Sequence, residues 1–147
     1  MVWKAGDKIT AARLSLDSNS TLLTDTTTFT VAAGYEQWGT EEITFDQPDV
    51  AVKVLAWLSG RLSNSVDADS EANVRVGISF DGGSTYTYGN TPQLNVGTGG
   101  SQRTTTSVLH HRSGIPTGDV VIRAEVDVFD ADVDARSGII MASLVPQ

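Results

Sequence analysis

Apolar residues recur at every second position in three long stretches of the chain, and this alternation constrains the fold more than any other feature. The stretches are VAVKVLAWL at 50–58, VRVGISF at 74–80 and VVIRAEVDVF at 120–129. Alternation of this period gives a β-strand one apolar face and one polar face. No segment shows the i, i+3, i+4, i+7 spacing of an amphipathic helix. The chain is therefore predicted to be all-β, with strands that bury one face.

The rest of the chain contains further strand candidates separated by turn-rich pieces. The tail GIIMASLV at 138–145 is apolar on both faces and is predicted to be a central strand covered on both sides. Weaker candidates lie at 26–33, 41–45, 86–89 and 104–112. About eight short strands with regular turns indicate an antiparallel β-sandwich of the jelly-roll type. We expect an N-terminal arm at 1–22 and one sandwich domain at 23–147.

Composition excludes several classes of site. The chain has 147 residues and no Cys, so it has no disulfide framework, zinc-thiolate site or Cys nucleophile. It contains no apolar run long enough for a membrane span, and its first residues lack the apolar core of a secretory signal. The net charge of −8 disfavours binding to a phosphate backbone. We therefore expect neither a nucleic acid nor a membrane as partner.

The segment ISFDGGSTYTYG fits the pattern S-x-D-x-G-x-T and places Asp81, Gly82 and Gly83 directly after an alternating strand. These are hairpin residues, because glycine adopts positive φ and an Asp carboxylate accepts hydrogen bonds from the backbone of the turn. The pattern resembles the Asp-box of sialidases, in which the motif is a structural hairpin and supplies no catalytic residue. We therefore expect a structural turn here and not a glycosidase site.

Histidines and acidic loops are the other candidates for chemistry, and we expect neither to provide it. His110 and His111 are neighbours on a predicted strand, so their side chains point to opposite faces and do not form a pair. Two loops carry alternate carboxylates that could bind Ca²⁺, although both lack the glycine and glutamate of an EF-hand. Their acids are Asp67, Asp69 and Glu71 in one loop, and Asp130, Asp132 and Asp134 in the other. No catalytic residue, metal site or cofactor is predicted.

Aromatic residues could instead form a platform on which a sugar stacks. Trp57 lies inside an apolar strand and is predicted to be packed, whereas Trp38, in GYEQWGTEE, is predicted to be the exposed candidate. Tyr35, Tyr86 and Tyr88 could add to such a platform. Aromatic residues on strands are more often part of a core or an interface, because they bury a large area.

The N-terminal stretch VWKAGDKITAARLS differs in character from the rest of the chain. It leads into Leu16, and it offers apolar residues but too little sequence to bury them alone. It is therefore predicted to be a partner-binding arm, through Trp3, Ile9, Leu14 and Leu16. The stretch resembles N-terminal segments of virion structural proteins of tailed bacteriophages, in which a Trp, a Gly-Asp pair and an Ile/Leu-Thr-Ala-Ala-x-Leu run recur. Those segments often end in Asn, where this chain has Ser15.

The resemblance implies a non-enzymatic protein of the phage virion, made in the host cytoplasm. The expected role is that of a capsid decoration or minor capsid protein, which binds the major capsid protein or another virion protein and stabilises the assembled head shell. Such a protein is expected to be a homo-oligomer, with a trimer as the first choice. The alternative is a tail-associated β-sandwich that recognises a receptor or glycan, and a hydrolase ranks third. Hundreds of copies per particle would favour the shell, and a few copies would favour the tail.

Overall fold

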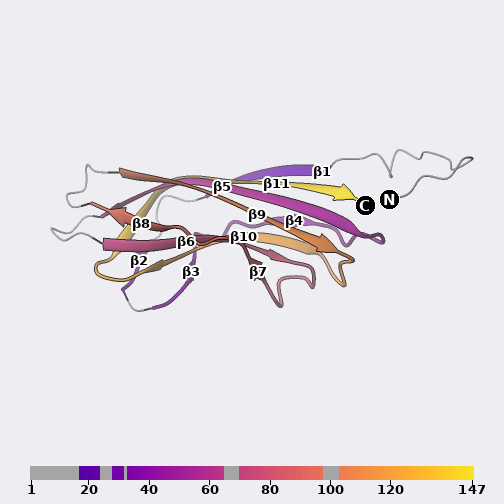
Figure 1. Cartoon of the computed structure of the whole chain (residues 1–147), viewed down its shortest axis with the longest axis horizontal. Helices are drawn as coiled ribbons and strands as arrows, with labels where there is room; N and C mark the ends of the chain where they lie inside the picture. Colours follow the sequence, from indigo (N-terminus) through magenta and orange to yellow (C-terminus); the bar gives the residue numbers. More distant parts are fainter. Residues whose placement is uncertain (1–16, 24–27, 32, 65–69, 98–102) are drawn as a thin grey trace, which may run out of the picture.

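The computed structural model describes residues 17–23, 28–31, 33–64, 70–97 and 103–147 of the chain (Figure 1). Strands in these residues form two antiparallel sheets, which lie one above the other in Figure 1. Among the same residues there is no helix long and apolar enough to cross a membrane. The prediction of an all-β sandwich is confirmed.

Sheet A, the five-stranded sheet, has the order β1-β11-β5-β9, and β2 pairs with β11 beyond β1. Its strands are β1 (Asp17–Leu23), β2 (Thr28–Phe29), β5 (Val52–Asn64), β9 (Arg103–Gly114) and β11 (Val133–Pro146). Long runs of antiparallel pairing join β5 to both β9 and β11. The two central strands, β5 and β11, therefore carry most of the sheet.

Sheet B, the six-stranded sheet, has the order β3-β10-β6-β7, with β4 paired to β10 and β8 paired to β6. Its strands are β3 (Glu36–Gln37), β4 (Ile43–Phe45), β6 (Ser70–Ser79), β7 (Thr87–Tyr88), β8 (Gln93–Val96) and β10 (Val120–Val128). The short pairs β3 with β4 and β7 with β8 each occupy one strand position. In sheet A, β1 and β2 likewise share one strand position beside β11. Each sheet therefore has four strand positions, in the order of a jelly roll.

The core lies between the sheets, and the alternating stretches supply most of it. The inward side chains of β5, β6 and β10 are fully or almost fully buried, among them Val54, Leu58, Val76, Ile78 and Ile122. The burial pattern of β5 alternates along most of its length, as the period-two spacing requires. The prediction that these strands each bury one face is confirmed.

Trp38 fills the centre of the sandwich and is fully buried, so the prediction that it is exposed was wrong. Its ring meets Phe29 edge-on, with the ring centroids 6.0 Å apart. Gly60 and Gly138 lie opposite each other on β5 and β11, and both face the indole. A Cβ on Gly60 would place Cζ3 of Trp38 only 2.9 Å away. The two glycines therefore provide the space that the indole occupies.

Two features of sheet A differ from the sequence-based expectations. Residues 17–22 belong to β1, which pairs with β11 from Asp17 onward, so the sandwich begins before the expected boundary between residues 22 and 23. The tail strand β11 is central, as predicted, but it is covered on one side only. Met141 and Val145 on its other side are 38% and 37% exposed. The second apolar face of the tail thus forms surface.

Candidate functional site

The loop that follows β6 carries the S-x-D-x-G-x-T pattern, and the motif is closed on itself. The Ser79 hydroxyl donates to Oδ1 of Asp81 at 2.7 Å, and the Thr85 hydroxyl donates to Oδ2 at 2.5 Å. Backbone N–H groups of Thr85 and Gly83 donate to Asp81 and Ser79 respectively. Gly82 and Gly83 have φ values of 68° and 86°, which glycine adopts without strain. The side-chain oxygens of Ser79, Asp81 and Thr85 are thus all used within the loop.

Asp81 is held ionised by these contacts. The hydrogen bond from the Ser79 hydroxyl, followed by those from Thr85, lowers the pKa of Asp81 from 3.8 to about 2. A general acid in a glycosidase needs the opposite shift, towards neutral pH. The electrostatics of the loop therefore suit a fixed turn and not acid catalysis.

The two histidines lie on opposite sides of β9. His110 pairs with buried Ala56 and points towards β7, where its Nε2 lies 3.4 Å from the Thr87 hydroxyl. Burial, followed by the charge of His111, lowers the pKa of His110 below 6.5. His111 points to the outer side of sheet A. The prediction that they face opposite ways is confirmed, and His110 acts as a packed strand residue.

A buried carboxylate organises the outer side of sheet B. Glu125 on β10 has a side chain only 4% exposed, and it forms ion pairs with Arg75 at 2.5 Å and Arg123 at 2.6 Å. The Tyr88 hydroxyl donates to the same carboxylate at 3.1 Å. The Arg75 guanidinium lies between two rings, 3.4 Å from the centroid of Tyr35 and 3.6 Å from that of Tyr88. We call these five residues the Glu125 cluster.

The arginines of the Glu125 cluster also occupy tyrosine ring faces on which a sugar could otherwise stack. Tyr35 and Tyr88 each turn a ring face to Arg75, and the Tyr86 ring lies 3.8 Å from the Arg123 guanidinium. A ring face used in this way is not free to stack on a sugar. The cluster therefore fastens sheet B and uses one face of the Tyr35 and Tyr88 rings.

No metal centre is found among the residues that the structure describes. Asp132 and Asp134 accept hydrogen bonds from Val31 N–H and the Thr28 hydroxyl, so they fasten the segment around β2 to β11. Asp67 and Asp69 lie outside the described residues. Two carboxylates of the acidic stretch 130–134 thus have a structural role.

The outer side of sheet A is the broadest candidate for a binding surface. Trp57 lies there, half-buried among neighbouring side chains, on the outer side of the sheet and not in the core. In the register of the sheet, Ser20, Met141, Trp57 and Leu109 form one row across four strands, and Ser18, Ser143, Leu55 and His111 form the next. A third row holds Leu22, Ile139, Ser59 and Ser107. We call these three rows the apolar face.

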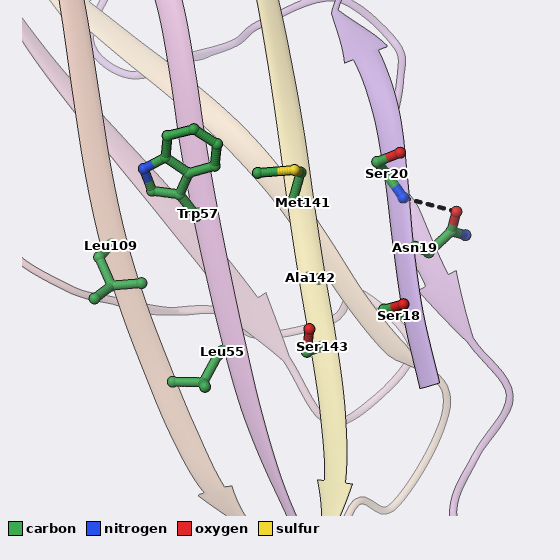
Figure 2. A pocket seen from close by; sticks show the side chains of 9 residues that line it. All are labelled: Ser18, Asn19, Ser20, Leu55, Trp57, Leu109, Met141, Ala142 and Ser143. Carbon is green, nitrogen blue, oxygen red and sulfur yellow. Dashed lines mark hydrogen bonds between the residues drawn. The ribbon is translucent and has the colours of Figure 1, made fainter. Parts of the chain in front are cut away.

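Figure 2 shows the centre of the apolar face, where the Trp57 indole lies between Leu109 and Met141. Trp57 Nε1 donates to the Ser107 hydroxyl at 2.6 Å, which fixes the ring along the sheet. A shallow groove of about 490 Å³ runs over these side chains to Ser18 and Ser20 of β1. Its lining combines small hydroxyls with large apolar groups, among them a Trp and a Met, which are enriched at interface cores.

Charge is distributed unevenly between the apolar face and the rest of the molecule. The chain has 18 acidic residues, yet none of them lies on the three rows of the apolar face. The row on one side of the face is Val145, Lys53 and Ser113, and the row on the other side is Ser137, Arg61 and Thr105. Among the described residues, the charged groups of these two flanking rows are Lys53 and Arg61, which are both basic.

The sequence does indicate the apolar face, because the tail strand is apolar on both sides. We interpreted its second apolar side as covered by another layer of the protein. Ile139 and Met141 in the tail, with Leu55 and Trp57 in β5, are apolar at positions where a half-exposed strand is usually polar. The predicted arm residues Trp3, Ile9, Leu14 and Leu16 lie outside the described residues. The Glu125 cluster carried no recognisable motif in the sequence.

The chain matches no protein-family model and no curated protein sequence. Among solved structures it is similar to that of the Gx strain of infectious bursal disease virus, with a TM-score of 0.49 and 13% identity over 87% of this chain and 32% of that chain. It is also similar to the crystal structure of the T13 particle of that virus, with a TM-score of 0.45 and 13% identity over 88% of this chain and 34% of the other. The chain thus spans about a third of the length of these viral chains. A likeness at this level assigns no function.

Proposed function

We propose that the chain is a non-enzymatic structural protein of a phage virion, which attaches to the assembled particle through its apolar face. The observation that carries the proposal is the absence of acidic groups from an apolar face on an otherwise acidic molecule. Soluble monomers rarely expose a continuous apolar patch of this kind unless it has a partner. The N-terminal resemblance to phage virion proteins supports the choice of partner.

The energetics suit a shell-binding protein. Leu109, Leu55 and Met141 are 62%, 39% and 38% exposed, so each has apolar area left to bury. Burying a large apolar side chain completely contributes about 1.5–3 kcal/mol, and these side chains would contribute a part of that each. A protein that binds the assembled shell, and not its free subunits, stabilises the shell by mass action. Many bound copies would therefore strengthen the shell. We therefore propose a capsid decoration or minor capsid protein, bound to the major capsid protein or another virion protein.

The proposed assembly state is a homo-oligomer, with a trimer as the first choice. In this arrangement the apolar face meets the shell, and the predicted arm provides a second contact through Trp3 and Ile9. Acidic groups elsewhere on the molecule keep free copies soluble at high concentration. Nothing in this role requires a cofactor, a metal or a nucleic acid.

A particle-binding experiment tests the proposal. Particles are assembled with the wild-type chain, with Leu109→Ser/Met141→Ser or with Ile115→Ser, and the copies that sediment with the particles are counted. Ile115 is 69% exposed and lies outside the apolar face, so it is the matched control. We expect the double variant to lose most of its binding and the control to keep it. If the wild-type chain is absent from particles, the virion role is wrong, and if the double variant binds normally, the apolar face is not the contact.

Trp57 favours a second candidate, a tail-associated module that binds a receptor glycan. Its half-buried indole lies in an open groove whose lining includes serine hydroxyls, and sugars stack on such rings. On this alternative the chain is present in a few copies per particle, and Trp57→Ala abolishes binding to a glycan array. High copy number without glycan binding would exclude it.

A further inference from the structure

A second groove lies at one end of the sandwich, between the start of β1, β4 and the end of β11, and we call it the acidic groove. It has a volume of about 380 Å³. Figure 1 shows β1, β4 and the end of β11 on the same half of the molecule. The lining consists of Asp17, Thr44, Phe45, Asp46, Pro48, Asp49, Val50, Val52, Leu144 and Pro146. The groove thus opens between the two sheets.

The floor of the acidic groove is apolar and continuous with the core. Val52 and Leu144 belong to the core cluster, and Phe45 packs against it. Val50, at the edge of the groove, is 43% exposed. An apolar side chain placed here would therefore extend the core, whereas an empty groove leaves this surface in water.

The rim of the acidic groove carries three exposed carboxylates, those of Asp17, Asp46 and Asp49. None of them forms an ion pair or a side-chain hydrogen bond with another described residue. Three like charges around an apolar floor favour an occupant that is both apolar and basic. The described rows that flank the apolar face carry Lys53 and Arg61 instead, so the two surfaces favour different partners.

The chain itself contains a segment with this chemistry, directly beside the groove. Residues 1–16 hold three of the ten basic residues, Lys4, Lys8 and Arg13, but only one of the eighteen acidic ones. The segment joins the sandwich at Asp17, which is part of the groove lining. Arg13 precedes Asp17 by four positions, a reach of at most about 14 Å. The apolar residues Leu14 and Leu16 lie within that reach.

We infer that Arg13–Leu16 docks in the acidic groove of its own chain, with Leu14 and Leu16 on the apolar floor and Arg13 beside Asp46 and Asp49. The chain's own segment has the advantage over that of a second copy, because a short tether gives an effective concentration on the order of millimolar. This inference does not depend on the virion role. It divides the predicted arm into an anchored part and a part around Trp3 and Ile9 that is left for a partner.

Hydrogen exchange of the full chain tests the inference. In the wild-type protein we expect the amides of residues 14–16 to exchange about tenfold or more slowly than in an unstructured peptide. Asp46→Lys/Asp49→Lys should remove this protection, as should high salt. Asp127→Lys/Asp130→Lys makes the same charge change at the end of β10 and in the turn after it, and should leave the protection intact. Adding Arg13→Glu to the groove variant should restore it.

Three results would overturn the inference. The first is the absence of protection in the wild-type chain. The second is equal protection in the groove variant and in the wild type. The third is protection that falls on dilution, which would show that the segment comes from a second copy. Intrinsic tryptophan fluorescence in urea, to which the buried Trp38 contributes, establishes that each variant is folded. Particle binding is measured separately, so failure here leaves the virion proposal standing.

Discussion

Replacing Glu125 by Ala tests whether the Glu125 cluster stabilises sheet B. The substitution removes the acceptor for two guanidinium groups and one tyrosine hydroxyl. Breaking a fully buried ion pair costs about 3–5 kcal/mol. The side chains of Arg75 and Arg123 are 21% and 27% exposed, so water compensates in part. We therefore expect the free energy of unfolding to fall by about 2–4 kcal/mol, somewhat less than for a fully buried pair.

Urea denaturation followed by tryptophan fluorescence measures this loss, and a thermal melt should show a fall of roughly 5–15 °C. Asp127→Ala is the matched control. Asp127 lies two residues further along the same side of β10, opposite Asn73, and it forms no hydrogen bond with a described residue. The control should change the unfolding free energy by less than about 0.5 kcal/mol. Equal effects of the two substitutions would refute the reasoning.

Three further outcomes are expected. Gly60→Ala should destabilise the fold by about 1–3 kcal/mol, because the new Cβ meets the immobile ring of Trp38, and a neutral result in a melt would contradict this packing. Asp81 has a folded pKa of about 2, below the unfolded value of 3.8, so its contribution is present above pH 4 and lost as the pH falls towards 2. The gap in stability between wild type and Asp81→Asn should therefore narrow over that range, and a gap that widens on acidification would reverse the sign assigned to the Ser79 hydrogen bond. A chelator should leave the melting temperature unchanged, because no metal-binding group of acids is found in the described chain, and a drop that Ca²⁺ restores would reveal a calcium site in one of the two acidic loops.

The fold class could be predicted from the sequence because a strand that buries one face alternates apolar and polar residues. Strands β5, β6 and β10 alternate, and each was recognised. Strand β1 has the sequence DSNSTLL, with only Leu23 buried, so it carries no alternation and was not recognised. A strand at the edge of a sheet, exposed on both faces, is fixed by its hydrogen-bonded neighbour, and that neighbour is distant in the sequence.

The wrong prediction at Trp38 and the outward position of Trp57 have one physical cause. The sequence around Trp38 is polar, yet the ring is buried because Gly60 and Gly138 leave room for it. Trp57 has apolar neighbours, yet it points outward because Ala56 and Leu58 take the inward positions. Local composition describes the neighbours along the chain, whereas burial depends on the residues that other strands bring close.

The order of strands has a consequence for how the protein is made. Asp17 pairs with Leu144, and β11 lies between β1 and β5 in sheet A. In sheet B, β10 likewise joins β3 and β4 to β6. Strands synthesised late therefore complete the middle of both sheets, and the earlier strands have unpaired edges until then. A growing chain with such open edges folds slowly and exposes apolar surface on the ribosome, so its yield should depend on temperature and chaperones more than that of a protein with local pairing.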